Sequence, residues 1–275
     1  MSITSELLKE FNIKLKKSLG QNFLSDQRVA ERISTAEDFS ECDLIIEIGA
    51  GAGTLTEELL KFGKRTITFE IDRRLEPLLE KRFNGNEKLE MKFMDFFEFI
   101  PTDDFLSGKA GFISNLPYCS GTAIIAKIFE NFNNFKLGVF MLQKEVAQRI
   151  LALPSTSNYG FLSVYMNYYT IPEKILDVSP SHFIPNPKID SSVLAMRPKD
   201  RVLSLFEENI FFRFVKRSFS NRRKMMKNNF IYPEKIEAIL LKTGLKKDVR
   251  AENLSVDDFL RFFNIFRYYE DEDGD

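Results

Sequence analysis

The sequence predicts an α/β protein with a mostly parallel, Rossmann-like sheet, followed by a small all-helical domain. Short apolar segments alternate with helical segments of roughly ten residues through the first half of the chain, which is typical of βαβ units. A glycine-rich turn follows the first of these apolar segments. Beyond Pro198 only helical periodicity remains. We therefore expect two domains, residues 1–198 and residues 199–275.

Apolar runs predict the strands of the first domain, and amphipathic stretches predict the helices between them. Strands are expected at residues 44–48, 66–69, 89–93, 110–114 and 137–142, and helices at residues 54–62, 73–82 and 121–130. Residues 159–169 are rich in β-formers, but their apolar side chains fall on one helical stripe, so we expect a helix. Two more strands, residues 171–178 and 190–196, flank a proline-rich loop.

The second domain is expected to consist of helices at residues 203–218, 233–242 and 255–266. The last of these begins with Ser255 and Asp258, which match the spacing of a capping box. Its apolar side chains recur at the spacing of a buried helix face.

Composition excludes several classes of function. No apolar run approaches the ~18 residues that a membrane span needs, and the charged N-terminal segment is unlike a secretory signal. Two cysteines give no disulfide framework, so we expect a cytoplasmic protein. With His182 as the single histidine, a His/Cys metal site lacks ligands and we expect no metal. No Gly-x-Ser-x-Gly elbow accompanies His182 for a serine hydrolase.

The glycine-rich turn predicts a cofactor site. Gly49, Gly51 and Gly53 lie between a strand and a helix, where glycines let the backbone turn sharply and approach a ligand closely. Glu70 ends the next strand and can accept hydrogen bonds from both hydroxyls of a ribose. Asp95 follows the third strand, where a carboxylate can reach an adenine amine.

Three interpretations of this turn compete. A dinucleotide site would require Gly-x-Gly-x-x-Gly, but Thr54 stands in place of the last glycine. The pattern from Glu47 to Gly53 is instead that of class I methyltransferases, whose ligand has no pyrophosphate. A glycine-rich turn without a ligand is the third possibility. Glu70 and Asp95 at the neighbouring strand ends favour a nucleoside cofactor, S-adenosylmethionine.

Residues 115–118 (Asn-Leu-Pro-Tyr) follow the fourth strand and predict methylation of a planar amine. The exocyclic nitrogen of adenine is a poor nucleophile because its lone pair is delocalised into the ring. Two acceptors for its N–H groups would localise the lone pair. The Asn115 side-chain oxygen supplies one acceptor, and the carbonyl of Leu116 or Pro117 supplies the other. Tyr118 offers a flat face on which the base can stack.

Asparagine and proline are also common turn residues, so this segment taken alone could be only a turn. Its position after a strand, in a chain with the cofactor pattern, favours the catalytic interpretation. Phe183, in a second proline-rich loop, could stack on the other face of the target base. The alternative for Phe183 is that it packs in a core.

Five segments in this order resemble the small-subunit ribosomal RNA adenine dimethyltransferases, the kasugamycin-sensitivity family. They are residues 17–24 (Lys-Ser-Leu-Gly-Gln-Asn-Phe-Leu), 47–53, 115–118, 183–191 and 219–224 (Phe-Ser-Asn-Arg-Arg-Lys). The sequence departs from the family's pattern at Ala50, where proline is common, and at Ser18 and Leu19, where an aromatic residue often precedes the glycine.

The resemblance implies the substrate, the cofactor contacts and a role in subunit biogenesis. It implies transfer of two methyl groups to each of two adjacent adenosines in a hairpin loop near the 3′ end of 16S rRNA, in the 30S subunit. We expect the enzyme to act as a monomer. The implied cofactor contacts are Asn22, Leu24, Gly49, Glu70, Asp95 and Asn115, to which the turn adds Gly51.

A basic segment fits an RNA partner although the net charge of the chain is −1. Residues 213–227 contain seven bases and no acid, so they can neutralise phosphates, although charge runs are often only solvated helix faces. The residues expected to bind RNA are Arg217, Arg222, Arg223 and Lys224.

Three other functions remain as alternatives. The related 23S rRNA dimethyltransferases that confer antibiotic resistance tend to carry isoleucine where Leu116 stands, and they usually lack the Arg-Arg-Lys pattern. Enzymes that methylate DNA adenine or a protein glutamine commonly carry proline at that position. A ribosome assembly factor that has lost turnover is the non-enzymatic alternative. The intact Glu70, Asp95 and Asn115 argue against lost chemistry.

Overall fold

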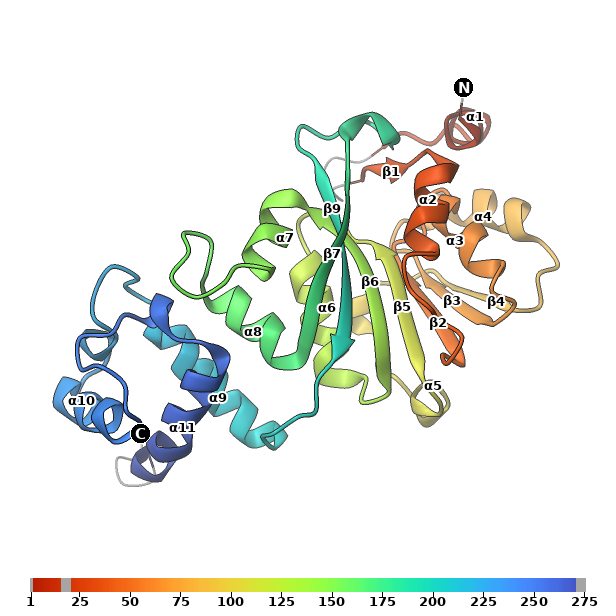
Figure 1. The fold of residues 1–275 in the computed structure, drawn as a ribbon. Helices are drawn as coiled ribbons and strands as arrows, with labels where there is room; N and C mark the ends of the chain where they lie inside the picture. The colour runs from red at the N-terminus through yellow and green to blue at the C-terminus, as the bar shows by residue number, and fades with distance from the viewer. Residues whose placement is uncertain (1, 16–20, 271–275) are drawn as a thin grey trace. The chain divides into compact units, whose positions relative to one another are not determined.

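The structure is a computed structural model that describes residues 2–15 and 21–270. It divides into two compact units, which are described separately (Figure 1). The first unit comprises Met1–Ala147 and Glu173–Pro198, and the second comprises Gln148–Pro172 and Lys199–Asp275. The sequence predicts a single domain boundary, after residue 198. The two units of the structure also divide there, but residues 148–172 belong with the C-terminal helices.

The first unit is built on a seven-stranded sheet of the order β4-β3-β2-β5-β6-β9-β7. The five neighbouring strands β4, β3, β2, β5 and β6 run parallel to one another, whereas β9 runs antiparallel to β6. Strands β1 and β8 form a separate antiparallel pair. The strands are β1 (Phe23–Leu24), β2 (Leu44–Ile48), β3 (Arg65–Phe69), β4 (Leu89–Lys92), β5 (Ala110–Asn115), β6 (Phe135–Gln143), β7 (Thr170–Val178), β8 (Phe183–Ile184) and β9 (Ser191–Pro198).

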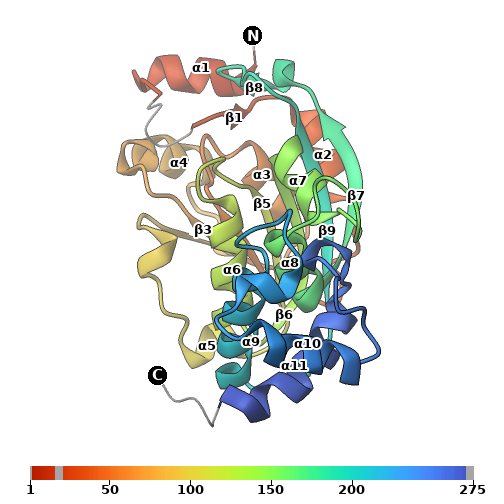
Figure 2. The same ribbon diagram turned by 90° about the vertical axis from the view of Figure 1, so that its left-hand side faces the viewer.

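Helices cover both faces of this sheet (Figures 1 and 2). Because side chains alternate along a strand, Ile113 of β5 joins the core under α2 and α3, whereas Phe112 packs edge-on against Phe132, which follows α6. The helices of this part of the chain are α1 (Ile3–Glu10), α2 (Gln27–Ser34), α3 (Thr54–Leu60), α4 (Glu76–Phe83), α5 (Asp103–Leu106), α6 (Gly121–Asn131) and α7 (Lys144–Ile150).

The expected strands and helices are confirmed, but six further elements among the described residues were missed. They are α1, α2, α5, α7, β1 and β8. Among them, helix α2 spans eight residues and buries Val29, Ala30 and Ile33. Its start is fixed by Asp26, whose side chain accepts a hydrogen bond from the Arg28 backbone N–H at 3.0 Å.

The parallel strands place the predicted site residues at one edge of the sheet. The carboxyl end of β2 is followed by Gly49, and that of β3 by Glu70. Strand β5 ends at Asn115, and Asp95 lies shortly after β4. Strands β2 and β3 are in register, with Ile48 opposite Phe69, so their ends meet at the same level. Ligands bind at this edge in open α/β sheets.

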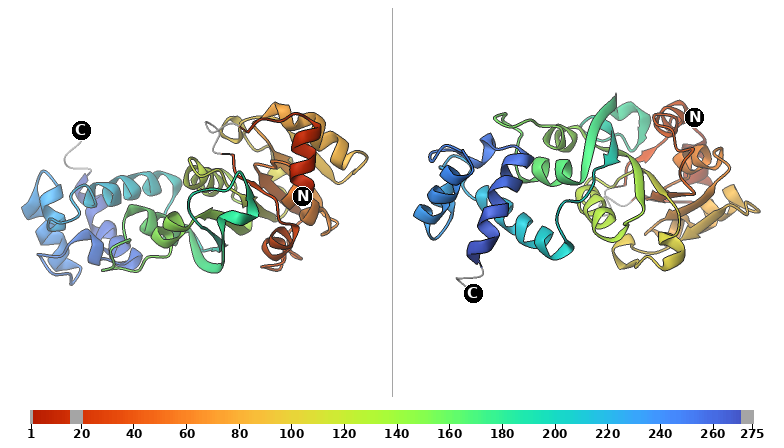
Figure 3. Two further views of the ribbon diagram at one scale, coloured as in Figure 1. Left: turned by 90° about the horizontal axis from the view of Figure 1, so that it is seen from above. Right: turned by 60° about the horizontal axis from the view of Figure 1, so that its bottom comes forward.

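The helices of the second unit, whose ribbons are drawn in Figure 3, pack around an aromatic core. Phe214 of α9 stacks on Phe262 of α11 with ring centroids 4.9 Å apart. Residues 148–172 belong here because the Tyr169 hydroxyl donates to buried Glu208 at 2.8 Å, and the Tyr159 hydroxyl donates to the Leu254 carbonyl at 2.6 Å. The helices are α8 (Phe161–Tyr169), α9 (Leu205–Ser218), α10 (Pro233–Lys242) and α11 (Val256–Glu270).

Within the described part of the chain, no helix has the length and apolar character that crossing a membrane requires.

Candidate active site

The glycine-rich turn after β2 adopts backbone conformations that favour glycine. Gly49, Gly51 and Gly53 have φ angles of +84°, +56° and +82°. A Cβ at Gly51 would lie 2.8 Å from the Phe23 ring, and one at Gly53 would lie 2.6 Å from the Phe83 ring. The turn therefore needs its glycines for conformation and packing as well as for any ligand.

Replacement of Gly53 by alanine is expected to destabilise the first unit by about 3 kcal/mol or more. Part of the cost is the left-handed conformation, and the rest is the collision with the buried ring of Phe83, the last residue of α4. Gly85 is the matched control, because its φ is +78° but nothing lies within 4 Å of a Cβ there. Chemical denaturation of both variants measures the difference, and equal losses would contradict the steric argument.

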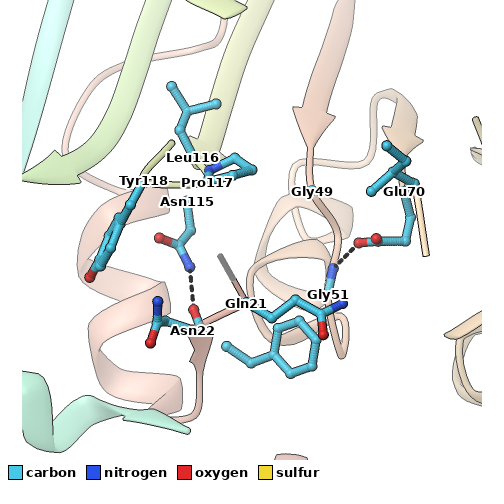
Figure 4. A pocket seen from close by; sticks show the side chains of 11 residues that line it. Gln21, Asn22, Gly49, Gly51, Glu70, Asn115, Leu116, Pro117 and Tyr118 are labelled. Carbon is cyan, nitrogen blue, oxygen red and sulfur yellow. Dashed lines mark hydrogen bonds between the residues drawn. The ribbon is translucent and has the colours of Figure 1, made fainter. Parts of the chain in front are cut away.

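Glu70 closes the glycine turn from the end of β3. Its carboxylate accepts hydrogen bonds from the backbone N–H groups of Gly51 and Asp72, each at 2.8 Å. Burial raises the pKa of Glu70, while these N–H donors favour its charged form and oppose the rise. Glu70 lines a cavity with Gly49, Gly51 and Asn115 (Figure 4). The carboxylate is thus positioned to accept hydrogen bonds from hydroxyl groups of a ligand in this cavity.

A second cavity of about 200 Å³ extends from Gly49 toward Asp95. The Asp95 side chain caps a short helical turn by accepting the Phe97 N–H at 2.8 Å. Both cavities include Gly49, Ile71 and Pro117 in their walls, so they form neighbouring parts of one cleft. The cleft runs from Asp95, the expected adenine end, to Asn115, the expected methyl end.

Sequence reasoning missed the apolar lining of this cleft. Ile71, directly after Glu70, is 50% exposed, and Phe97 is 44% exposed. Together with Met94 and Cys119 they surround the Asp95 cavity, where flat apolar surface suits an adenine ring. An apolar residue directly after the strand-end Glu70 was the available signal.

Asn115, the last residue of β5, is held in one orientation. Its side-chain Nδ2 donates to the Asn22 backbone carbonyl at 3.1 Å (Figure 4). A carbonyl can only accept, so this contact assigns the nitrogen to the Asn22 side and places Oδ1 on the side of Tyr118 (Figure 4). The structure thus presents the acceptor that the expected chemistry requires.

The next three residues differ in what they expose. The Leu116 side chain is buried, and its N–H donates to the Met141 carbonyl at 3.2 Å. The Pro117 carbonyl accepts the N–H groups of Ser120 and Gly121 at the start of α6, so it is already occupied. Of the two expected backbone acceptors, the Leu116 carbonyl is therefore favoured. Tyr118 lines the cavity, half-buried.

The described residues of the N-terminal motif line the cleft. Gln21 donates to Asp72 at 2.8 Å, and Asn22 lines the Asn115 cavity. Leu24 is buried and lies in the wall of a small adjoining cavity beside Gly49. The remainder of the motif, residues 17–20, lies outside the described residues.

The structure corrects the expectation for Phe183. Its ring is 1% exposed and belongs to the core that includes Leu24, Val29 and Val178. The reason is the pairing of β8 with β1, which places Phe183 opposite Leu24. In this structure Phe183 packs in a core and presents no face to a target base.

Glu47 is a buried acid that sequence reasoning used only as part of the glycine pattern. It accepts a hydrogen bond from the Thr56 hydroxyl at 2.6 Å. Burial raises the pKa of Glu47 to about 8. The folded protein therefore keeps a proton on Glu47 at neutral pH that the unfolded chain releases near its ordinary pKa.

This bound proton makes stability fall as pH rises. Between about pH 4.5 and about pH 8 the unfolded state holds fewer protons on this group, so higher pH favours unfolding, and the effect levels off above the folded pKa. Glu47→Gln keeps the shape of the side chain but cannot ionise, so it is expected to abolish a loss on the order of 5 kcal/mol in the free energy of unfolding across this range. Denaturant unfolding at several pH values measures it; parallel curves for both proteins would contradict the assignment.

The four basic residues expected to bind RNA differ in the contacts that they make within the second unit. Arg223 and Lys224 are exposed and make no ion pair with any described residue. Exposed Arg217 donates to the Asn229 carbonyl at 3.0 Å and lies over the Phe230 ring. Its remaining N–H groups are available to an anion.

The structure corrects the expectation for Arg222. Its guanidinium donates to the carbonyls of Ser157 and Thr156 at 2.6 and 2.9 Å and pairs with Glu252 at 3.0 Å. These contacts join the loop after α7 to the C-terminal helices within the second unit. Arg222 therefore serves internal packing.

Comparison with known sequences finds relatives over nearly the whole chain. A profile of the family described as "Ribosomal RNA adenine dimethylase" matches residues 12–268. The chain is 41% identical over 264 residues to "Ribosomal RNA small subunit methyltransferase A" of Thermotoga neapolitana, with 96% of each chain covered. It is 36% identical to the protein of the same name from Clostridioides difficile, covering 95% of this chain and 94% of the relative.

Solved structures agree with this similarity. A dimethyladenosine transferase from Plasmodium falciparum has a TM-score of 0.78 at 26% identity, covering 90% of this chain and 98% of that one. The 23S rRNA methyltransferase ErmE has a TM-score of 0.68 at 24% identity, covering 88% and 98%, which shows a common fold alone. The expected Rossmann-like methyltransferase fold is confirmed.

Proposed function

Because the chain belongs to the ribosomal RNA adenine dimethylase family, we propose that it dimethylates adenosines of small-subunit ribosomal RNA. The methyl donor is S-adenosylmethionine. The acceptors are the N6 amines of two adjacent adenosines in a hairpin loop near the 3′ end of 16S rRNA, and the reaction belongs to the biogenesis of the 30S subunit. We further propose that the enzyme acts in the cytoplasm as a monomer.

The orientation of Asn115 is the observation that carries this proposal. Its Oδ1 and the Leu116 carbonyl are acceptors at the end of β5, and Tyr118 lies beside them. An adenine amine that donates one N–H to each acceptor gains a localised lone pair. The sulfonium methyl is already activated, so the main contribution of the protein is alignment for in-line displacement. Water can take the proton that the amine then loses.

The cleft residues are proposed to hold the cofactor. Glu70 would accept the ribose hydroxyls, and Asp95 would accept the adenine amine while Ile71 covers the ring. The backbone of Gly49 and Gly51 would approach the amino-acid part of the cofactor closely. Asn22 and Leu24 border the same region from the N-terminal motif.

The exposed cations of the second unit are proposed to bind RNA phosphates. This role fits the exposed side chains of Arg217, Arg223 and Lys224. It is not proposed for Arg222, because the guanidinium of Arg222 already donates to backbone carbonyls of the same unit. Phosphate contacts supply affinity that falls with salt and depends little on sequence.

Methylation of purified subunits tests the proposed function. Small subunits that lack the modification are incubated with the enzyme and labelled cofactor, and digested RNA is analysed by mass spectrometry. Dimethyladenosine in 16S rRNA supports the proposal. The proposal is rejected if the product appears in 23S rRNA or DNA instead, or if the enzyme binds the subunit without transferring methyl groups. Each of these results would favour one of the alternatives. Leu116 and the pattern from Arg222 to Lys224 favour the small subunit.

A further inference from the structure

The Tyr118 ring is held at its far end as well as at its backbone. Its hydroxyl lies 2.8 Å from the Ser191 hydroxyl, and this is a side-chain hydrogen bond across 73 residues of sequence. Burial raises the pKa of the Tyr118 phenol, so the group stays neutral and retains its hydroxyl proton. The ring that borders the Asn115 cavity is therefore fixed at two points.

The sheet brings Ser191 to the reacting edge. Ser191 is the first residue of β9 and lies opposite Gln143 of β6, while Met141 of β6 lies opposite Asn115 of β5. Because β9 runs antiparallel to β6, the start of β9 meets the carboxyl end of β6. A single strand thus separates Ser191 from Asn115. Ser191 is fully buried.

Neighbouring contacts keep the start of β9 in place. The Lys144 backbone N–H donates to the Asp190 carbonyl at 3.0 Å, and its Nζ reaches the Asp190 carboxylate at 3.2 Å. Ser192 is equally buried, but its hydroxyl donates to Asp177 at 2.6 Å. Consecutive strand residues point to opposite faces, so only Ser191 of the two serines faces Tyr118.

We propose that Ser191 is a positioning residue for methyl transfer, acting through the hydroxyl of Tyr118. The inference rests on the proposed function, in which the target adenine stacks on Tyr118. Without Ser191 the ring can pivot about its Cα–Cβ and Cβ–Cγ bonds. A base stacked on that ring must present its amine to Asn115 and the Leu116 carbonyl together, and small misplacements are costly to such alignment.

A double-mutant cycle tests the inference. The proteins are Ser191→Ala, Tyr118→Phe and the combined variant, assayed in single turnovers with unmethylated small subunits and labelled cofactor. Each single change is expected to lower the maximal transfer rate constant about 10-fold, while the subunit concentration that gives the half-maximal rate changes little. The double variant should match the single variants, because Ser191 has no partner once the phenol hydroxyl is gone. Ser191→Thr, which retains a hydroxyl, should recover most of the rate.

Ser192→Ala is the matched control, because it removes an equally buried hydroxyl that does not contact Tyr118. It is expected to lower the melting temperature without lowering the transfer rate. The inference is overturned if Ser191→Ala transfers at the wild-type rate, if Ser192→Ala loses as much, or if Ser191→Ala costs a further 10-fold in the Tyr118→Phe background. If Ser191→Ala fails to fold, Tyr118→Phe still decides, since its wild-type rate would refute the proposal. Failure of the wild-type enzyme to methylate 16S rRNA would instead reject the proposed function.

Discussion

Replacement of Asn115 by alanine is expected to lower the rate of methyl transfer on the order of 10³-fold while small-subunit binding stays nearly unchanged. The variant loses the acceptor that Oδ1 presents to the adenine amine, and this interaction strengthens as the nitrogen attacks the methyl group. The variant also leaves the Asn22 carbonyl without the hydrogen bond that it accepts in the wild-type protein from the Asn115 side chain, at 3.1 Å. Single-turnover transfer and subunit binding, measured on the same preparation, separate the two effects.

Asn131→Ala is the control for this experiment. Asn131 ends α6 on the surface, and among the described residues its side chain donates to the Lys127 carbonyl of its own helix alone. Its loss should leave transfer unaffected. Asn115→Asp is also informative, because the carboxylate keeps oxygen acceptors but cannot donate to the Asn22 carbonyl and is repelled by it. Near-normal transfer by Asn115→Ala would refute the assigned role of this side chain.

Much of the first unit could be predicted from the sequence because its order is local and periodic. The alternation of apolar strands with helices indicated the parallel sheet, and strand ends then placed Gly49, Glu70, Asp95 and Asn115 at one edge without any knowledge of contacts. Helix α2 escaped because its eight residues hold too few turns for a clear periodic signal. Helices α3 and α4 are no longer than α2, but they were indicated by their place between predicted strands.

Long-range contacts explain the remaining differences. Phe183 in its proline-rich loop resembles an exposed aromatic, but its pairing with Leu24, far away in sequence, buries it. Arg222 is one of seven bases in an acid-free segment, but Glu252 and the loop after α7 engage it. The grouping of residues 148–172 with the C-terminal helices likewise depends on distant partners, such as Glu208. No local pattern contains these partners.

Alanine substitution of both Arg223 and Lys224 is expected to weaken small-subunit binding about 10- to 100-fold at moderate salt and to reduce the slope of log affinity against log salt by roughly 1 to 2. Both side chains are exposed and free of ion pairs with described residues, so each can displace a counterion from a phosphate. Binding titrations at several salt concentrations measure the slope directly.

Two variants of the same unit show whether position or charge alone decides the effect. Lys246 and Lys247 are likewise adjacent and exposed, and their alanine pair is the charge-matched control that should leave the slope nearly unchanged. Arg222→Ala removes one positive charge from the same segment, but it breaks the contacts with Thr156, Ser157 and Glu252. It should therefore lower unfolding stability and leave the salt slope close to that of the wild type. A slope reduced as much by Arg222→Ala, or by the lysine pair, would mean that RNA binding is spread over the unit and is not centred on Arg223 and Lys224.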